Sequence, residues 1–242
     1  MTASELAGTA TPPPAPATAS ATRRIAVIGL FVLLLVSLAA RTFFAFWEPP
    51  FDGTVRYDDV RALGGAYWPM NLYLGGPGYA ISWVATAVFI VLLAHGRGRA
   101  LNLLGALLSG VGGILFALTI TAEALPFAYA ADPMVLPEPA GRELFDILNA
   151  HLGLLVPAIV GTQVAIAVGV LAALVGTLLS KAMPRWLSIA GIAYVIVFAA
   201  LPAETSGPVT AAIVYLLQVT LVAAIGWFGL RAGLGRRSLT PR

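Results

Sequence analysis

Cysteine is absent from this chain, and charged residues are scarce. Only 10% of the 242 residues are charged, against about 25% in a typical soluble domain. The missing cysteine excludes disulfide bonds, thiolate metal sites and cysteine-based nucleophilic or redox chemistry. Lysine is nearly absent as well, since Lys181 is the one example among 14 basic residues. The shortage of charge means that most of the surface is not built to face water, and the Ala-, Gly- and Pro-rich composition is typical of a GC-rich bacterial genome.

Motifs of the common enzyme chemistries are also missing. The chain has no phosphate-binding glycine loop, no His-Glu-x-x-His and no Gly-x-Ser-x-Gly. Its two histidines, His95 and His151, fall on opposite sides of the membrane in the topology derived below, which excludes a bis-histidine haem site. We therefore predict no catalytic residue, no metal site and no cofactor.

The apolar residues, 59% of the chain, are gathered in six blocks. A bilayer core about 30 Å thick needs about 20 helical residues, and each block reaches or approaches that length. We therefore predict an all-α membrane protein with a six-helix transmembrane domain over residues 23–232. Pro157 predicts a kinked or tilted fourth helix. The six predicted spans are 25–47, 78–94, 101–122, 152–179, 186–201 and 209–230.

The remaining segments are two tails and two large loops. Residues 1–22 are mostly Ala, Thr, Ser and Pro, which predicts a disordered tail, and residues 233–242 form a basic tail. The loops at 48–77 and 123–150 join the first to the second span and the third to the fourth. Within these loops we predict a short helix from Asp58 and an amphipathic helix at 139–149.

The distribution of charge predicts the orientation of the bundle. The residues before the first span and after the last, together with the short loops after the second and fourth spans, include ten basic residues and one acid. The alternate loops, together with the outer end of the first span, hold four arginines and ten acids. Basic residues are enriched in short cytoplasmic segments, so we predict that both termini are cytoplasmic, in a multi-pass protein of the bacterial plasma membrane. The basic residues thus face the inner membrane surface rather than a nucleic acid.

The start of the first span has a second interpretation. Thr22-Arg23-Arg24 resembles a twin-arginine export signal, and Leu38-Ala39-Ala40 resembles a cleavage site. The apolar run continues to Trp47, however, which is longer than the apolar core of such a signal. An anchored first helix is therefore the favoured interpretation.

Small residues recur at helical spacing in the third and fourth spans. Lipid provides no hydrophobic drive between helices, so membrane helices gain contact by close backbone approach at small residues. We predict that these two helices pack on one another, and the alternative is a homodimer interface or a hinge for gating. The residues concerned are Gly105, Ser109, Gly112 and Gly113 in the third span and Gly161, Ala165 and Gly169 in the fourth.

Four titratable residues, Arg41, Glu123, His151 and Glu204, are predicted at one level near the outer membrane surface. One hypothesis joins them in a small site for a cation, a metal or a polar ligand, or for passing a proton. The favoured interpretation is that they are interfacial residues, with one salt bridge such as Arg41–Glu123.

Deeper in the membrane, the sequence places Gln163 and Gln218, and no charged residue lies at the centre of any span. An amide at this depth normally makes an interhelical hydrogen bond. A transport path lined by Gln163 or Gln218 is the alternative. The missing midplane carboxylate argues against an ion-coupled transporter.

The helix layout, together with the predicted cytoplasmic turn from Lys181 to Leu187 and Gly191, resembles a family of six-helix bacterial membrane proteins, common in actinobacteria. That family is classed as a domain of unknown function. The resemblance covers residues 25–232, and it implies the six-helix fold and no particular activity.

Three functions follow as hypotheses. The first is a non-enzymatic integral membrane protein, an envelope or accessory component. The second is a small-molecule transporter or permease subunit. The third is a membrane enzyme or ligand sensor with a polar site in the outer leaflet. In each of them the lipid bilayer is the predicted surrounding, and a second copy of the chain or another membrane protein is the expected type of partner.

Overall fold

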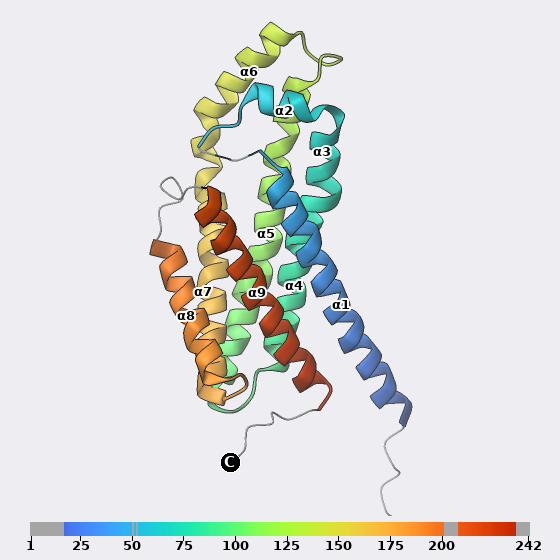
Figure 1. Ribbon diagram of the computed structural model, residues 1–242, viewed down its shortest axis with the longest axis vertical. Helices are drawn as coiled ribbons and strands as arrows, with labels where there is room; N and C mark the ends of the chain where they lie inside the picture. Colours follow the sequence, from blue (N-terminus) through green and yellow to red (C-terminus); the bar gives the residue numbers. More distant parts are fainter. Residues whose placement is uncertain (1–16, 50, 52, 201–207, 236–242) are drawn as a thin grey trace, which may run out of the picture.

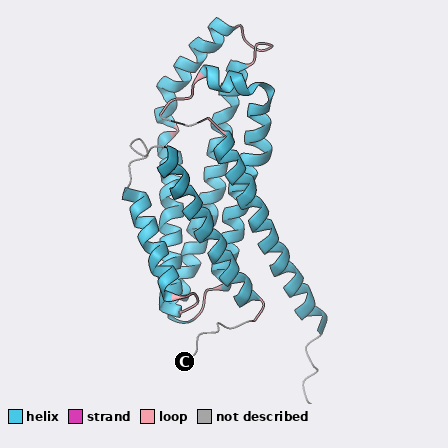
Figure 2. Ribbon diagram, viewed as in Figure 1, coloured by secondary structure: helices cyan, strands magenta, loops and turns pink. Residues whose placement is uncertain are grey.

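The computed structural model describes residues 17–49, 51, 53–200 and 208–235, and all regular structure in these ranges is helical (Figure 2). Backbone groups that cross a membrane must find their hydrogen bonds within the segment, which helices achieve. The α-helices are α1 Ala17–Trp47, α2 Tyr57–Leu63, α3 Tyr67–Met70, α4 Gly76–Leu92, α5 Arg99–Ala131, α6 Glu138–His151, α7 Val156–Ser180, α8 Arg185–Ala200 and α9 Pro208–Gly233. Short 3-10 or π-helical turns precede α3, α4, α5 and α7.

Among the described residues, five helical segments are long and apolar enough to cross a membrane, which agrees with the predicted class of all-α membrane protein. Four of them contain α1, α5, α7 and α9, and the fifth is the nearly continuous run from α2 through α4. The predicted fifth span at 186–201 corresponds to α8. With 16 residues, α8 is about 24 Å long, and it is shorter than the other segments.

Several helix boundaries differ from those predicted. Helix α5 does not end at 122 but continues through Pro126 to Ala131, because Phe127 and Ala130 on this extension are buried beneath α2 and α6. Helix α7 begins only at Val156, with Pro157 in its first turn. A proline there needs no backbone N–H and causes no interior kink, so the expected kink is replaced by a break before the helix.

The N-terminal boundary also moves, because residues 17–22, predicted as part of the disordered tail, belong to α1. Residues 1–16 and 236–242, the rest of the predicted tails, lie outside the described residues.

The helices run along one long axis, and the turns gather at its two ends (Figure 1). The beginning of α1 and the end of α9 lie at the same end, together with the α4–α5 and α7–α8 turns. At the opposite end, α2 and α6 lie over the bundle, and we call these two helices and the end of α5 between them the cap. The cap contains both short helices predicted in the large loops.

Helices α5 and α7 approach each other at glycine. A methyl group added to Gly105 would lie 2.5 Å from the carbonyl oxygen of Gly169, and one added to Gly169 would lie 2.6 Å from the amide nitrogen of Ser109. Contacts this short are possible only without a side chain. Gly112 faces Ile166 and Ala165 in the same seam.

Two of the predicted seam residues lie elsewhere. Gly113 is in contact with Trp83 of α4 rather than with α7, and Gly161 has no neighbouring atom within 4 Å of the place a side chain would take. Four-residue spacing drifts around a helix that turns every 3.6 residues, so the stripe from Gly169 has left the seam by Gly161. The prediction was wrong for these two residues.

Candidate functional site

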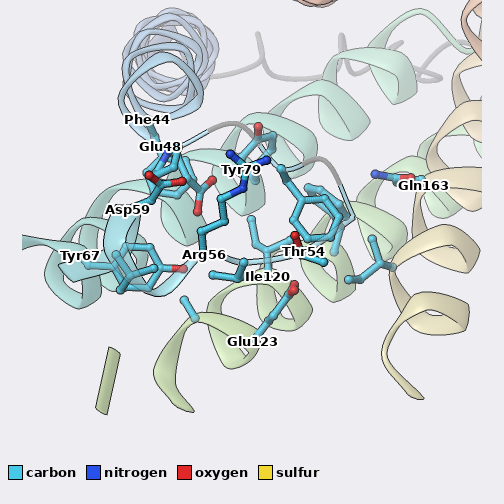
Figure 3. A pocket seen from close by; sticks show the side chains of 17 residues that line it. Phe44, Glu48, Thr54, Arg56, Asp59, Tyr67, Tyr79, Ile120, Glu123 and Gln163 are labelled. Carbon is cyan, nitrogen blue, oxygen red and sulfur yellow. The ribbon is translucent and has the colours of Figure 1, made fainter. Parts of the chain in front are cut away.

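A cavity of about 230 Å³ lies where the cap meets the bundle (Figure 3). Its walls come from the end of α1, the segment leading into α2, helices α2 and α3, the start of α4, the C-terminal half of α5 and the beginning of α7. The lining combines charged, aromatic and amide side chains. These lining side chains include Phe44, Glu48, Arg56, Asp59, Tyr67, Tyr79, Phe116, Glu123 and Gln163.

Carboxylates dominate the charge of this cavity. Glu48, Asp59 and Glu123 line it together with one basic residue, Arg56. Within the described ranges, the ion pairs join Arg142 to Asp58 and to Glu138, so neither Glu48 nor Glu123 is held in one of them. Burial, with the negative charge of Glu123 second, raises the pKa of Glu48 to about 7.

Aromatic rings form much of the remaining wall. Phe44, Tyr67, Tyr79 and Phe116 line the cavity, and Tyr79 meets Phe116 edge to face, with 5.2 Å between ring centroids. Ring faces carry negative electrostatic potential and attract cations. The rings and the carboxylates therefore favour the same kind of ligand.

Glycines in and before α4 bring α1 to this position. A methyl group added to Gly75 would lie 2.8 Å from the ring of Phe44, and one added to Gly78 would lie 3.0 Å from the amide nitrogen of Arg41. The close approach carries the C-terminal turn of α1 over the cavity, and Glu48 follows directly, its amide donating to the Phe44 carbonyl at 2.9 Å.

The other side of the cavity is held by the cap. The Asn149 amide group of α6 accepts a hydrogen bond from the Val55 amide and donates one to the Val55 carbonyl, both at 2.9 Å. These two hydrogen bonds tie the segment before α2 to α6. It thereby sets the place of Arg56 and Asp59, which follow in the chain.

Arg41 forms a second polar centre next to the cavity, on the far side of Tyr79. It is fully buried and lies between α1, α4 and α9. Its guanidinium donates to the Ser82 hydroxyl at 3.2 Å and to the Gln218 side-chain oxygen at 3.3 Å. The rings of Tyr79, Trp83 and Tyr215 surround it, with centroids 5.3–5.8 Å from its Cζ atom.

The six predicted polar residues therefore separate into groups. Glu123 and Gln163 line the cavity, and Arg41 and Gln218 are hydrogen-bonded to each other. The suggested Arg41–Glu123 salt bridge is wrong, because the hydrogen bonds of Arg41 to described residues go to neutral oxygens of α4 and α9. His151 lies apart, with its Nδ1 2.7 Å from the carbonyl oxygen of Ile147 on its own helix. Glu204 lies outside the described residues.

Sequence reasoning missed most of the cavity lining. Asp59 and Tyr67, which line the cavity, were not among the candidate site residues predicted from the sequence. Tyr79 carries a usable signal, because Tyr79, Ser82, Trp83 and Thr86 follow helical spacing along the face of α4 that meets Arg41. For Glu48, the sequence shows no more than an acid after an apolar span.

The cavity does not have the arrangement of a metal site. In the described part of the chain, no group of three or more acidic or histidine side chains is placed to hold a metal ion. The carboxylates thus line a wider space than a single metal ion would need.

Comparisons with models of protein families, with curated proteins and with solved structures gave no match. The resemblance to six-helix bacterial membrane proteins therefore stays a prediction.

Proposed function

We propose that this is a non-enzymatic integral protein of a bacterial plasma membrane, which binds a small organic cation in its outer cavity. The observation that carries the proposal is the lining of that cavity, with three carboxylates, one arginine and five aromatic rings around about 230 Å³. Among the functions inferred from the sequence, this is closest to the ligand sensor with an outer polar site.

An organic cation fits this lining better than a metal ion. A quaternary ammonium group attracts aromatic faces as well as carboxylates, and both are present. The hypothesis of an enzyme or ligand sensor built on Arg41, Glu123, His151 and Glu204, in contrast, required these four residues to converge. Among the three that are described, no hydrogen bond or ion pair joins any two.

The topology that accompanies this proposal has six crossings and cytoplasmic termini. Helix α8 supplies the sixth crossing, and it is supported by its apolar composition and by the course of the chain from one end of the bundle toward the other (Figure 1). The beginning of α1 and the end of α9 lie on the side of the bundle that bears the basic turns, which supports a cytoplasmic position for both termini. The cavity then opens toward the extracytoplasmic side.

Binding of choline tests the proposal. Calorimetric titration of choline into the purified protein in detergent is expected to show saturable binding at one site. Glu123→Gln is expected to weaken it at least about tenfold, or about 1.4 kcal/mol, because the substitution keeps the shape and removes the charge. The matched control is Glu143→Gln, an exposed residue of α6. Absence of binding, or equal effects of the two variants, would contradict the proposal.

Transport is a second candidate, favoured by Gln163. This exposed amide of α7 lines the same cavity, as the transport hypothesis expected. Uptake of labelled choline into proteoliposomes separates the two functions. Accumulation that Gln163→Leu abolishes, with binding retained, would establish transport, whereas binding without accumulation would leave the sensor or accessory role.

A further inference from the structure

Arg41 carries a buried positive charge that the described residues leave without a negative partner. Its side chain has no exposed surface, and its hydrogen-bond acceptors, the Ser82 hydroxyl and the Gln218 amide oxygen, are both neutral. An isolated charge is costly at such a position, and groups of this kind in membrane proteins usually have a functional role. Arg41 is not among the cavity-lining residues on which the proposed cation binding depends.

Two polar atoms of this centre lack hydrogen bonds to described residues. They are the Nε atom of Arg41 and the hydroxyl of Tyr215, and both are buried. The ring of Tyr215 lies 5.8 Å from the Arg41 Cζ atom, so the two belong to one group. Unsatisfied buried polar atoms are costly, and the charge of the Arg41 guanidinium leaves a positive field that the surrounding rings offset only in part.

One aromatic ring separates Arg41 from the cavity. Tyr79 lines the cavity, and the centroid of its ring lies 5.5 Å from the Arg41 Cζ atom. Phe44, one helical turn beyond Arg41 on α1, lines the cavity too. In a low-dielectric interior the field of a charge extends across such a distance with little screening. The α1–α4 wall of the cavity is therefore positive behind Tyr79.

The carboxylates define the negative part of the same space. Glu123 projects from α5, and Glu48 and Asp59 lie next to each other on another side of the cavity, as the close view shows (Figure 3). Arg56 adds a basic group on the cap side. Without Arg41, three acids against one base would select a simple cation. With it, the cavity presents a negative region and a positive wall.

We propose that the ligand is a zwitterion, with its ammonium group among the carboxylates and its anionic group toward the α1–α4 wall, in the field of Arg41. This inference rests on the proposed function and names the class of its ligand. Arg41 acts here as a specificity-determining residue through its charge, without touching the ligand.

Glycine betaine and choline test this directly, because both carry a trimethylammonium group and only betaine has a carboxylate. In the wild-type protein we expect betaine to bind about tenfold more tightly than choline, measured by the same calorimetric titration. If neither compound binds, the proposed function itself fails. If choline binds as well as betaine or better, the zwitterion proposal is overturned while the proposed function stands.

Two substitutions of Arg41 assign the preference to its charge. Arg41→Met replaces the guanidinium by an apolar chain, which buried sites often tolerate, and is expected to remove the betaine preference while choline binding persists. Arg41→Lys keeps the charge and is expected to keep the preference, and Arg142→Gln is the control for an exposed arginine away from the cavity. A preference that survives in Arg41→Met, or that Arg41→Lys loses as completely as Arg41→Met does, would overturn the role of Arg41.

Discussion

The cap and the membrane bundle are stabilised in different ways, although α5 belongs to both. In the bundle, α5 meets α7 through backbone contact at Gly105 and Gly169. In the cap, the end of α5 supplies Phe127 to an aromatic cluster. The ring centroid of Phe127 lies 4.9 Å from that of Phe145. Tyr57 of α2 completes the cluster, 5.1 Å from Phe145.

The surfaces of the two regions differ in the same sense. In the bundle, large apolar side chains such as Leu107 and Leu118 are more than 60% exposed. In the cap, Arg142 pairs with Asp58 at 2.6 Å and with Glu138 at 2.9 Å, and these hydrogen bonds raise the pKa of Arg142. Water drives apolar burial in the cap, whereas lipid offers no such drive and the bundle depends on close contact. Helix α5 is thus stabilised by close backbone contact in the bundle and by burial of apolar side chains in the cap.

The largest expected effect is that of a large side chain in the bundle seam. Gly169→Leu would force its Cβ within 2.6 Å of the Ser109 amide nitrogen and 2.9 Å of the Gly105 carbonyl oxygen, and neither backbone atom can move alone. We expect α5 and α7 to separate and folded protein to be lost. The measurement is the yield of monodisperse protein after detergent extraction, by size-exclusion chromatography.

Gly161→Leu is the matched control. It makes the same change in the same helix at a glycine with no neighbour within 4 Å. We expect a yield close to that of wild type. Equal losses in the two variants would show that helix flexibility, rather than contact between helices, is what these glycines provide.

The next effect, confined to the cap, follows from Phe145→Ala. Phe145 is 2% exposed, and truncating a buried Phe to Ala typically costs about 3–5 kcal/mol. We expect the cap to open locally while the bundle persists. Hydrogen exchange should rise in α2 and α6 and stay low in α7. Ile147→Ala, at a position 49% exposed, is the control, and exchange rising throughout the chain in Phe145→Ala would show that cap and bundle unfold together.

The sequence predicted the bundle better than the cap. Apolar blocks bounded by charge identify membrane helices because hydrophobic length is a property of each segment alone. The predicted end of the third span at 122 failed because Glu123 interrupts the apolar run. The helix continues there because burial of Phe127 and Ala130 depends on α2 and α6, which segment composition does not reveal.

The candidate site was predicted in part for a similar reason. Arg41 and Glu123 were identified as unusual charges, but their pairing depends on how α1 is rotated against α4. That rotation is set by contacts at Gly75 and Gly78, and it turns Arg41 toward Ser82 and Gln218 instead of Glu123. Residue types show which groups need partners, and helix packing decides which partners they find.

The smallest expected effect belongs to Glu48, at the junction of the cap and the bundle. Its pKa of about 7 exceeds the ordinary value of 4.5, so between these values the folded protein retains a proton that the unfolded chain releases. The contribution of Glu48 to stability is therefore complete below about pH 4.5 and is lost as pH rises through 7.

Allowing for the partial exposure of Glu48, we expect about 1–2 kcal/mol less stability from this residue at pH 8 than at pH 4.5. Thermal melting in detergent between pH 4.5 and 8 measures it. The melting temperature of Glu48→Gln should fall less between pH 4.5 and 8 than that of wild type. Gln163→Ala, which alters a neutral residue of the same cavity, should show the same fall as wild type. An unchanged pH dependence in Glu48→Gln would show that Glu48 reaches water as freely as the exposed carboxylates of the cap, and would place it with the cap rather than with the bundle.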